Sequence, residues 1–215
     1  MARLRWGEDS PADSSDARRR LLDAAEACFG HYGVMKTTVE DVAAKAQVSR
    51  ATVYRYFDGR EDLILGVLMR EANRFLGRLG KRLQRDVSFA DAIVEGVMYT
   101  LAAVRADPHL ALLFAPEAAG VTGAIAGASE ALFSATADFL RPLLVDAAER
   151  GRLRPGVDPD EAAEWILRTI LSMLTVRGPT VRSDAANRRY LLTFLVPAVA
   201  TDPPAPVAST KRRRR

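Results

Sequence analysis

Cysteine is almost absent from this chain of 215 residues, because Cys28 is its single cysteine. One thiol can form no internal disulfide and no multi-cysteine zinc site. Histidine is nearly as scarce, and His31 and His109 do not stand at a metal-binding spacing such as His-Glu-x-x-His. No apolar run reaches the roughly 18 residues that span a bilayer, and the first residues lack the apolar segment of a secretory signal. We therefore expect no metal site, no membrane span and a cytoplasmic location.

The motifs of several enzyme classes are also missing. The chain contains no Gly-x-Ser-x-Gly nucleophile elbow, no Walker phosphate loop and no Rossmann fingerprint. The glycines at 120, 123 and 127 are irregularly spaced, without the Lys-Ser/Thr pair of a phosphate loop. We expect either a connection there or the start of a helix whose small residues allow close packing or motion. The sequence thus predicts no enzymatic activity and no cofactor.

Charge is nearly balanced outside the last residues. The formal net charge is +4, and Lys211 to Arg215 contribute +5, so the rest of the chain sums to −1. Any affinity for nucleic acid must then come from the local placement of charge. The tail either adds a salt-sensitive, sequence-blind attraction to phosphate or is a solvated, disordered terminus.

Residues 37–60 carry the clearest pattern in the chain, which predicts two short helices joined by a tight turn. Thr38 can cap the first helix, although Thr37 followed three residues later by Glu40 also fits a capping box. Ser49 can cap the second helix. The side chains expected to face inward, at helical spacing, are Val39, Val42, Ala43, Ala46, Val53, Tyr56 and Phe57.

The other face of the second helix is rich in side chains that suit DNA. Arg can donate two hydrogen bonds to guanine, Thr can contact bases, and Ala permits close approach. Tyr, Arg and the free N–H groups of capped helix N-termini bind phosphates, although the tyrosines also fit a packing role. A DNA-reading helix-turn-helix accounts for such a face. The predicted DNA contacts here are Thr38, Ser49, Arg50, Ala51, Thr52, Tyr54, Arg55 and Tyr56.

This stretch, preceded by Phe29-Gly30-His31-Tyr32-Gly33, resembles the tetracycline-repressor (TetR) family of bacterial regulators. The most specific parts are the run 52–57, Thr-Val-Tyr-Arg-Tyr-Phe, and the run 60–63, Arg-Glu-Asp-Leu. The likeness covers about the first third of the chain. It implies a three-helix helix-turn-helix head joined to a larger helical body, and it implies that Arg60 contacts a DNA phosphate.

Helical periodicity continues through most of the remaining chain, so the sequence predicts an all-α protein. The three arginines at 18–20, in the first turn of the first helix, face either the DNA backbone or solvent. We divide the chain into a flexible N-terminal arm, a TetR-type helix-turn-helix DNA-binding domain, a helical effector-binding and dimerisation domain, and a disordered basic tail. These parts span residues 1–15, 16–76, 77–200 and 201–215.

The last two long helices are expected at about 158–177 and 183–199. The first of them is apolar on most of its circumference, so it must be covered on more than one side. We expect this pair to pack against a second copy of the chain, although complete burial within one subunit also fits. Members of the TetR family are similar, since they dimerise through a four-helix bundle made by their last two long helices.

The resemblance further implies a small-molecule effector in the body, and the lack of a polar cluster favours an apolar one. Candidate lining residues are Met98, Tyr99, Phe114, Phe133, Phe139 and Trp165. The leading hypothesis is a ligand-responsive regulator, most simply a repressor, that binds double-stranded operator DNA. Its dimer would place two recognition helices in successive major grooves of a palindrome, roughly 34–36 Å apart. The alternatives are a helical interaction protein acting mainly through a protein partner and, last, a helical enzyme.

Overall fold

The computed structural model describes residues 11–82, 88–127, 129–176, 178 and 181–201. Across these residues the protein is all-α, as predicted, and the β-type contact found among them is an isolated antiparallel bridge between Leu153 and Ala200. Most of the expected N-terminal arm, and all of the expected basic tail except residue 201, lie outside the described residues.

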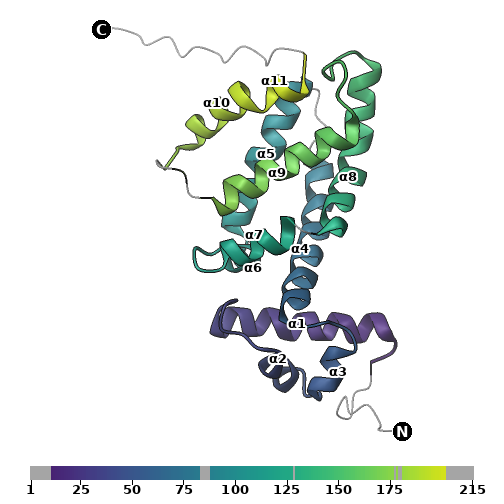
Figure 1. Cartoon of the computed structure of the whole chain (residues 1–215), viewed down its shortest axis with the longest axis vertical. Helices are drawn as coiled ribbons and strands as arrows, with labels where there is room; N and C mark the ends of the chain where they lie inside the picture. The colour runs from purple at the N-terminus through teal and green to yellow at the C-terminus, as the bar shows by residue number, and fades with distance from the viewer. Residues whose placement is uncertain (1–10, 83–87, 128, 177, 179–180, 202–215) are drawn as a thin grey trace.

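Three helices form a small head at one end of the molecule (Figure 1). The first ends at Gly33, whose positive φ of 82° suits glycine. Thr38 caps the second and forms a capping box with Asp41, so the alternative box of Thr37 with Glu40 is wrong. The Thr37 hydroxyl instead donates to the Gly33 carbonyl at 2.9 Å. The head helices are α1 (Ser14–Tyr32), α2 (Val39–Lys45) and α3 (Arg50–Tyr54).

The larger body is built from the remaining helices, and side-chain caps begin several of them. Ser88 and Asp158 each accept a hydrogen bond from the first turn of the helix that follows. The helices that complete the fold are α4 (Arg60–Arg82), α5 (Phe89–Ala106), α6 (Pro108–Leu113), α7 (Ala119–Gly127), α8 (Glu130–Glu149), α9 (Pro159–Thr175), α10 (Asp184–Phe194) and α11 (Val196–Val199).

Two expectations about the body need correction. The glycine-spaced region is not a connection but helix α7, in line with the alternative of a helix with closely packed small residues: a Cβ on Gly123 would lie 2.9 Å from Thr175 Cγ2 on α9. The single helix expected at 183–199 is divided into α10 and α11. Pro197 has no N–H to donate to the carbonyl four residues earlier, which explains the interruption.

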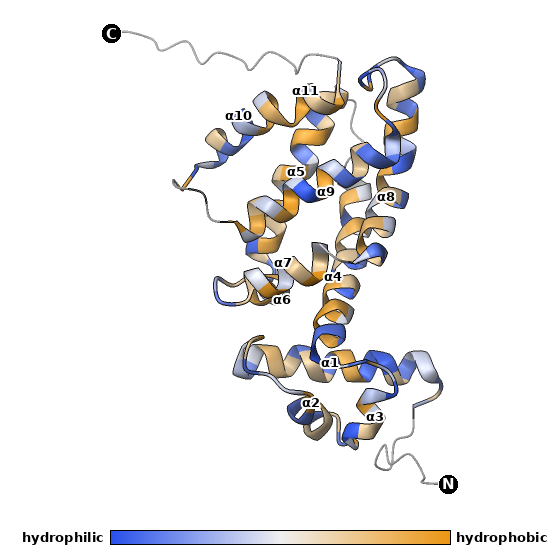
Figure 2. Ribbon diagram, in the orientation of Figure 1, coloured by the Kyte–Doolittle hydropathy of each residue, from blue (hydrophilic) through white to orange (hydrophobic). Residues whose placement is uncertain are grey.

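Helix α4 belongs to both parts of the molecule, because it leaves the head and continues into the body (Figure 1). Hydrophobic residues follow it upward, as Figure 2 shows, and Leu63, Ile64, Val67, Leu68, Phe75 and Leu79 are buried. The buried residues of the head form one continuous cluster with residues of α6, α7, α8 and α9. That cluster includes Cys28, and burial raises the pKa of its thiol. A second cluster joins α5, α8, α9, α10 and α11.

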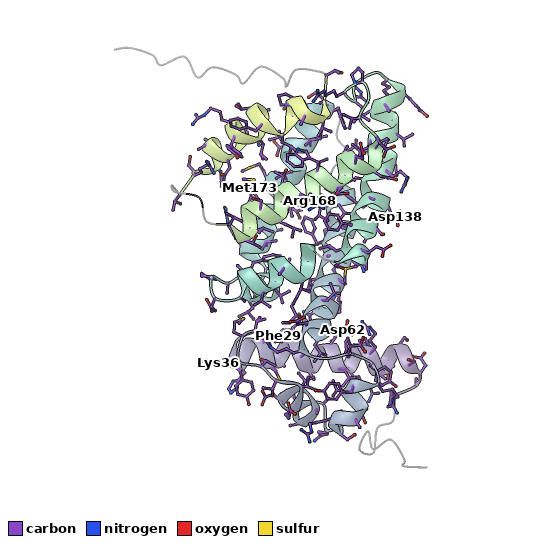
Figure 3. All side chains as sticks on the ribbon, in the orientation of Figure 1. Phe29, Lys36, Asp62, Asp138, Arg168 and Met173 are labelled. Atoms are coloured by element: carbon purple, nitrogen blue, oxygen red, sulfur yellow. The ribbon has the colours of Figure 1, made fainter. Side chains whose placement is uncertain are left out.

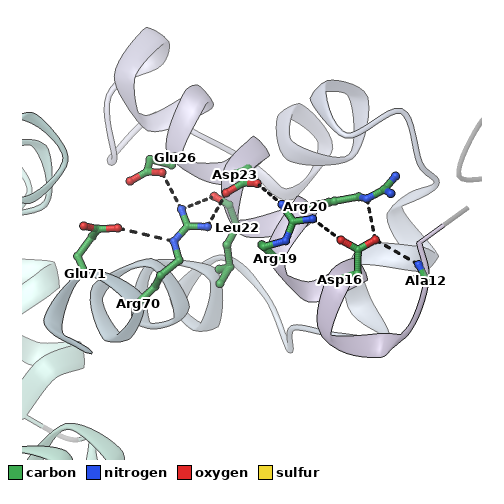
Figure 4. Close-up of polar contacts among 9 residues, drawn as sticks. All are labelled: Ala12, Asp16, Arg19, Arg20, Leu22, Asp23, Glu26, Arg70 and Glu71. Carbon is green, nitrogen blue, oxygen red and sulfur yellow. Dashed lines mark hydrogen bonds and ion pairs between the residues drawn. The ribbon is translucent and has the colours of Figure 1, made fainter. Parts of the chain in front are cut away.

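The contact between α1 and α4 combines close packing with buried charge. A Cβ on Gly66 would lie 2.8 Å from Leu22 Cδ2 and 3.0 Å from Phe57 Cε1, so a larger residue there would require these two side chains to shift. One turn later the Arg70 guanidinium, 12% exposed, donates to Asp23 and Glu26 of α1, at 2.6 Å in each case (Figure 4). Its attachment fixes the orientation of α4 on the head.

The glycines of α4 give a matched test of this contact. Gly66→Ala should destabilise the protein, because overpacking costs about 1–3 kcal/mol and exceeds the helix-propensity gain of about 0.5–1 kcal/mol. Gly77→Ala in the same helix meets no atom within 4 Å and should stabilise the protein by that propensity gain. Urea unfolding at one fixed protein concentration measures both changes. Equal effects at the two positions would contradict the proposed close contact.

Candidate nucleic-acid interface and ligand cavity

The turn between α2 and α3 has the geometry of a helix-turn-helix. Helix α2 ends with the Val48 N–H donating to the Ala43 carbonyl at 2.9 Å, and Gln47 between them adopts a left-handed φ of 56°. The Ser49 hydroxyl then caps α3 by accepting from the Thr52 N–H at 3.1 Å. The break and the second cap therefore fall where the sequence predicts them.

Four of the predicted DNA contacts lie exposed on or beside α3: Arg50, Ala51, Tyr54 and Arg55. The Tyr54 side chain is among the large exposed hydrophobic residues, at 52%. The Arg50 guanidinium projects toward α2, where its Nη1 donates to Glu40 Oε1 at 2.8 Å. This hydrogen bond lowers the pKa of the Glu40 carboxyl and raises that of Arg50, so both groups are charged at neutral pH.

The expectation that Thr52 faces outward is wrong. Its side chain is buried next to Val53, and its hydroxyl oxygen lies 2.9 Å from the Ser49 hydroxyl. Helix α3 has only five residues, and both Thr52 and Val53 are buried against the core of the head. Thr38 and Ser49 are exposed, and their side chains hold the helix caps.

Arg60 has contacts inside the head that the sequence did not reveal. Its Nε donates to the Thr37 carbonyl at 3.0 Å and its Nη2 to the Val34 carbonyl at 2.8 Å. These bonds tie the start of α4 to the loop that leads into α2. The side chain is half-buried, so its first role in the described structure is to hold that loop.

Arginines at the start of α1 also make contacts within the head. Arg18 Nη1 donates to the Tyr56 carbonyl at 2.8 Å, and its guanidinium lies 4.2 Å from the Phe57 ring centroid. Tyr56 itself is half-buried, with the Arg55 guanidinium 5.1 Å from its ring centroid. Arg19 and Arg20 both form ion pairs with Asp16. Interaction with these groups limits how freely arginines 18–20 can reach another partner.

Two features of the head are not apparent from the sequence. The sequence suggests Glu40 only as a possible member of a capping box, and its pairing with Arg50 joins positions ten residues apart across a turn. Lys36, labelled in Figure 3, is an exposed cation on the loop before α2. Helical periodicity distinguishes neither residue. For Lys36 the sequence does hold a signal of its position, because this lysine directly precedes two threonines, the second of which caps α2.

An apolar cavity of about 110 Å³ lies in the body, walled by α4, α5, α6, α8 and α9. Among the residues that the structure describes, Thr100 and Thr136 are its only polar side chains, and their hydroxyls donate to the Gly96 and Leu132 carbonyls of their own helices. The lining residues are Leu68, Ala72, Phe75, Leu76, Leu79, Thr100, Val104, Leu110, Phe114, Leu132, Thr136, Phe139, Leu140, Ile166, Leu167, Ile170, Leu171 and Leu174.

The structure divides the predicted effector residues. Phe114 and Phe139 line the cavity, and Tyr99 stacks at 5.6 Å on Phe75, which lines it. The other three do not line it. Met98 packs against the second core cluster, Phe133 lies beside a surface hollow under the Arg168 guanidinium, and Trp165 is half-exposed.

A second, open hollow separates α9 from α10 and has a volume of about 560 Å³. Trp165, Tyr190 and Phe194 line it and are among the large hydrophobic residues that remain exposed. Met173 and Arg168, labelled in Figure 3, line it from α9. The two segments expected to dimerise thus present an uncovered, largely apolar groove.

The structure adds two observations about other classes of site. None of the helices in the described ranges is both long and apolar enough to cross a bilayer. Among the same residues, no three His, Cys, Asp or Glu side chains are grouped so that they could hold a metal ion.

Comparison with known sequences connects this architecture to regulators of transcription. The family profile described as "Bacterial regulatory proteins, tetR family" matches residues 21–67. An uncharacterized HTH-type transcriptional regulator of Mycobacterium tuberculosis is 32% identical over 198 residues, which cover 91% of this chain and 90% of the relative. The match therefore extends well beyond the head.

Two solved structures share the fold. SmeT, the repressor of the Stenotrophomonas maltophilia multidrug efflux pump SmeDEF, is 25% identical with a TM-score of 0.55 over 86% of this chain and 91% of its own. SmeT has also been solved as a complex with triclosan. The transcriptional regulator FadR of Bacillus subtilis, in complex with stearoyl-CoA, is 19% identical with a TM-score of 0.56 over 84% of this chain and 98% of its own.

The contacts of Arg60 predict that its replacement lowers the stability of the protein even when no DNA is present. Arg60→Met removes two charge-assisted hydrogen bonds to main-chain carbonyls and should destabilise the protein by about 2–3 kcal/mol. Lys36→Met removes the same charge from an exposed position of the neighbouring loop and should change stability by less than about 0.5 kcal/mol. Chemical unfolding of both variants without DNA makes the comparison. An Arg60→Met protein as stable as the parent would contradict the structural role.

Proposed function

The chain belongs to the TetR family of bacterial regulatory proteins, and we propose that it is a ligand-responsive repressor that binds a palindromic operator as a homodimer. As a member of this family it is a transcriptional regulator and not an enzyme. The observation that carries the proposal is the exposed face of α3, held at one end of the molecule by a complete helix-turn-helix. Such a regulator acts in the cytoplasm of the bacterium, where the DNA is.

In this proposal α3 enters the major groove. Arg50 donates to guanine, Ala51 allows close approach, and Tyr54 and Arg55 hold the phosphates that flank the bases. The capped N-terminus of α2, at Thr38, directs its free N–H groups to the backbone. Thr52 is buried and makes no base contact. Three other residues act by holding nearby segments in place: Ser49 and Tyr56 hold α3, and Arg60 holds the loop that leads into α2.

The groove between α9 and α10 supplies the proposed dimer contact. Trp165, Tyr190 and Phe194 leave large apolar surfaces exposed to water, and a second copy of the same groove would cover them. A twofold axis uses the same patch on both subunits, so the two heads read inverted half-sites. The palindrome of the proposed operator follows from that symmetry.

The cavity supports an effector that is apolar and uncharged. The described part of its lining contains no charged side chain, and its two threonine hydroxyls already donate within their own helices. A buried charge without a partner is strongly disfavoured, so a charged ligand does not suit it. The complex of the related SmeT with triclosan supports an apolar ligand of modest size. Stearoyl-CoA is the ligand of FadR, which shares only the fold.

The volume of about 110 Å³ is below the roughly 300 Å³ at which ligand pockets usually begin. An effector must therefore widen the cavity by moving its walls, of which α4 is one. Because α4 also holds the head, a ligand that favours the widened state disfavours the head position that binds the operator. The loss of operator affinity is then set by the difference between the affinities of the ligand for the widened and the unwidened state.

Selection from random duplex DNA tests the proposal, because it requires no assumption about the operator sequence. Purified protein at near-physiological salt should enrich a palindrome whose half-sites lie about one helical turn apart. The enriched site then serves in a titration with neutral apolar compounds, triclosan among them. Failure of a folded protein to enrich any sequence would overturn the proposal and favour the alternative of a helical interaction protein.

Arg50→Ala should weaken binding to the enriched site by about 1–3 kcal/mol per half-site and relax the base preference at one position of each half-site. The reason is the loss of a two-bond contact to guanine. Fluorescence anisotropy with a panel of single-base variants measures both effects. Arg150→Ala, an exposed arginine of the body paired with Asp146, is the matched control and should bind like the parent. Unchanged base preference in Arg50→Ala would refute the assignment.

Phe194→Glu should convert the dimer to monomer, because it places a charge in the apolar groove that the partner would cover. Light scattering after size-exclusion chromatography measures the mass across a concentration series. Val145→Glu alters an exposed valine of α8 outside the groove and should remain dimeric. A dimeric Phe194→Glu protein would exclude this groove as the subunit contact.

A further inference from the structure

The Glu40 carboxylate occupies an unexpected place for a DNA-reading head. It projects from the second residue of α2 to the first residue of α3, where it accepts from Arg50 Nη1 at 2.8 Å. Both side chains are more than half exposed, so burial of the pair does not explain its presence. Exposed ion pairs contribute little to stability, so the stability of the head gives little reason for this one.

The pair has two consequences for a protein that approaches DNA. A carboxylate next to the guanidinium cancels the local positive charge and repels phosphates, so it weakens the sequence-blind attraction that Arg50 would otherwise supply. It also restricts the flexible arginine side chain. Glu40 binds Nη1, and the opposite edge, formed by Nε and Nη2, is one of the two edges with which arginine can make paired hydrogen bonds.

We propose that Glu40 is a specificity-determining residue, which positions Arg50 for guanine and suppresses the contact of Arg50 with phosphates. This inference rests on the proposed DNA-reading function and deepens it. The carboxylate itself can accept a hydrogen bond from cytosine N4, whereas the acceptor oxygens of guanine and thymine repel it. The Glu40–Arg50 pair therefore favours a G·C pair at its position in each half-site.

The test uses the full-length protein, a site enriched by the parent, and a scrambled duplex of equal length. Glu40→Gln keeps the size of the side chain and removes its charge. We expect it to bind the scrambled duplex more tightly and to lose about tenfold in the ratio of specific to nonspecific affinity. The slope of log affinity against log salt for scrambled DNA should steepen by about 0.9 for each Arg50 released, or about 1.8 for a dimer.

Two further variants separate positioning from simple charge. Glu130→Gln removes an equal charge from the exposed first turn of α8 in the body and should leave the ratio and the salt slope unchanged. In an Arg50→Ala background, Glu40→Gln should have little further effect, because the carboxylate acts through Arg50. Unfolding curves show whether each variant is folded like the parent, so that a loss of folding is not mistaken for a change in DNA binding.

The outcomes distinguish this inference from the proposed function. A parent protein that discriminates between the two duplexes, with a Glu40→Gln variant that keeps the same ratio, overturns the role of Glu40 alone. An effect of Glu40→Gln that is equally large without Arg50 shows plain charge repulsion and also overturns the positioning role. A parent that enriches no sequence overturns the proposed function, and this inference with it.

Discussion

The close contact between α1 and α4 is the constraint on which the arrangement of the molecule depends. At Gly66 a Cβ would press on the Leu22 and Phe57 side chains, and one turn later Arg70 joins α4 to carboxylates of α1. Buried ion pairs add little net stability but strongly penalise arrangements that separate the partners. The contact therefore fixes the angle between the head and α4 more than it holds the fold together. A single core cluster that continues from head to body reinforces that coupling.

Successive turns of α4 have different tasks. Its first residue, Arg60, holds the loop before α2, Gly66 and Arg70 hold α1, and Phe75 and Leu79 line the apolar cavity. Because a helix is stiff along its axis, pressure on its cavity turns is carried to its first turns. The polar anchors lie toward the head and the apolar wall lies toward the body. In the proposed mechanism, this division would let one helix respond to an apolar ligand without breaking the contact that positions α3.

Local rules account for what the sequence predicted well. The caps at Thr38 and Ser49, and the periodicity of apolar residues, were predictable because these signals act within one or two turns. The failures involve contacts distant along the chain. The glycines left a connection and a helix open for α7, which packs on α9, and nothing local showed that Thr52 is covered. Aromatic side chains could be counted as cavity candidates, but only the tertiary packing separated Phe114 and Phe139 from the exposed Trp165.

Several arginines of the head are bonded within the protein, and this affects how the head can bind DNA. Arg18, Arg60 and Arg70 donate to main-chain carbonyls, and Arg50 is paired with Glu40. The chain without its last five residues has a net charge of −1, so no general cationic field compensates for these occupied groups. Weak sequence-blind attraction leaves more of the affinity to depend on matched contacts in the groove. A regulator built this way discriminates better between sites but binds each of them less tightly, and the proposed dimer would restore the affinity by bringing two heads to one operator.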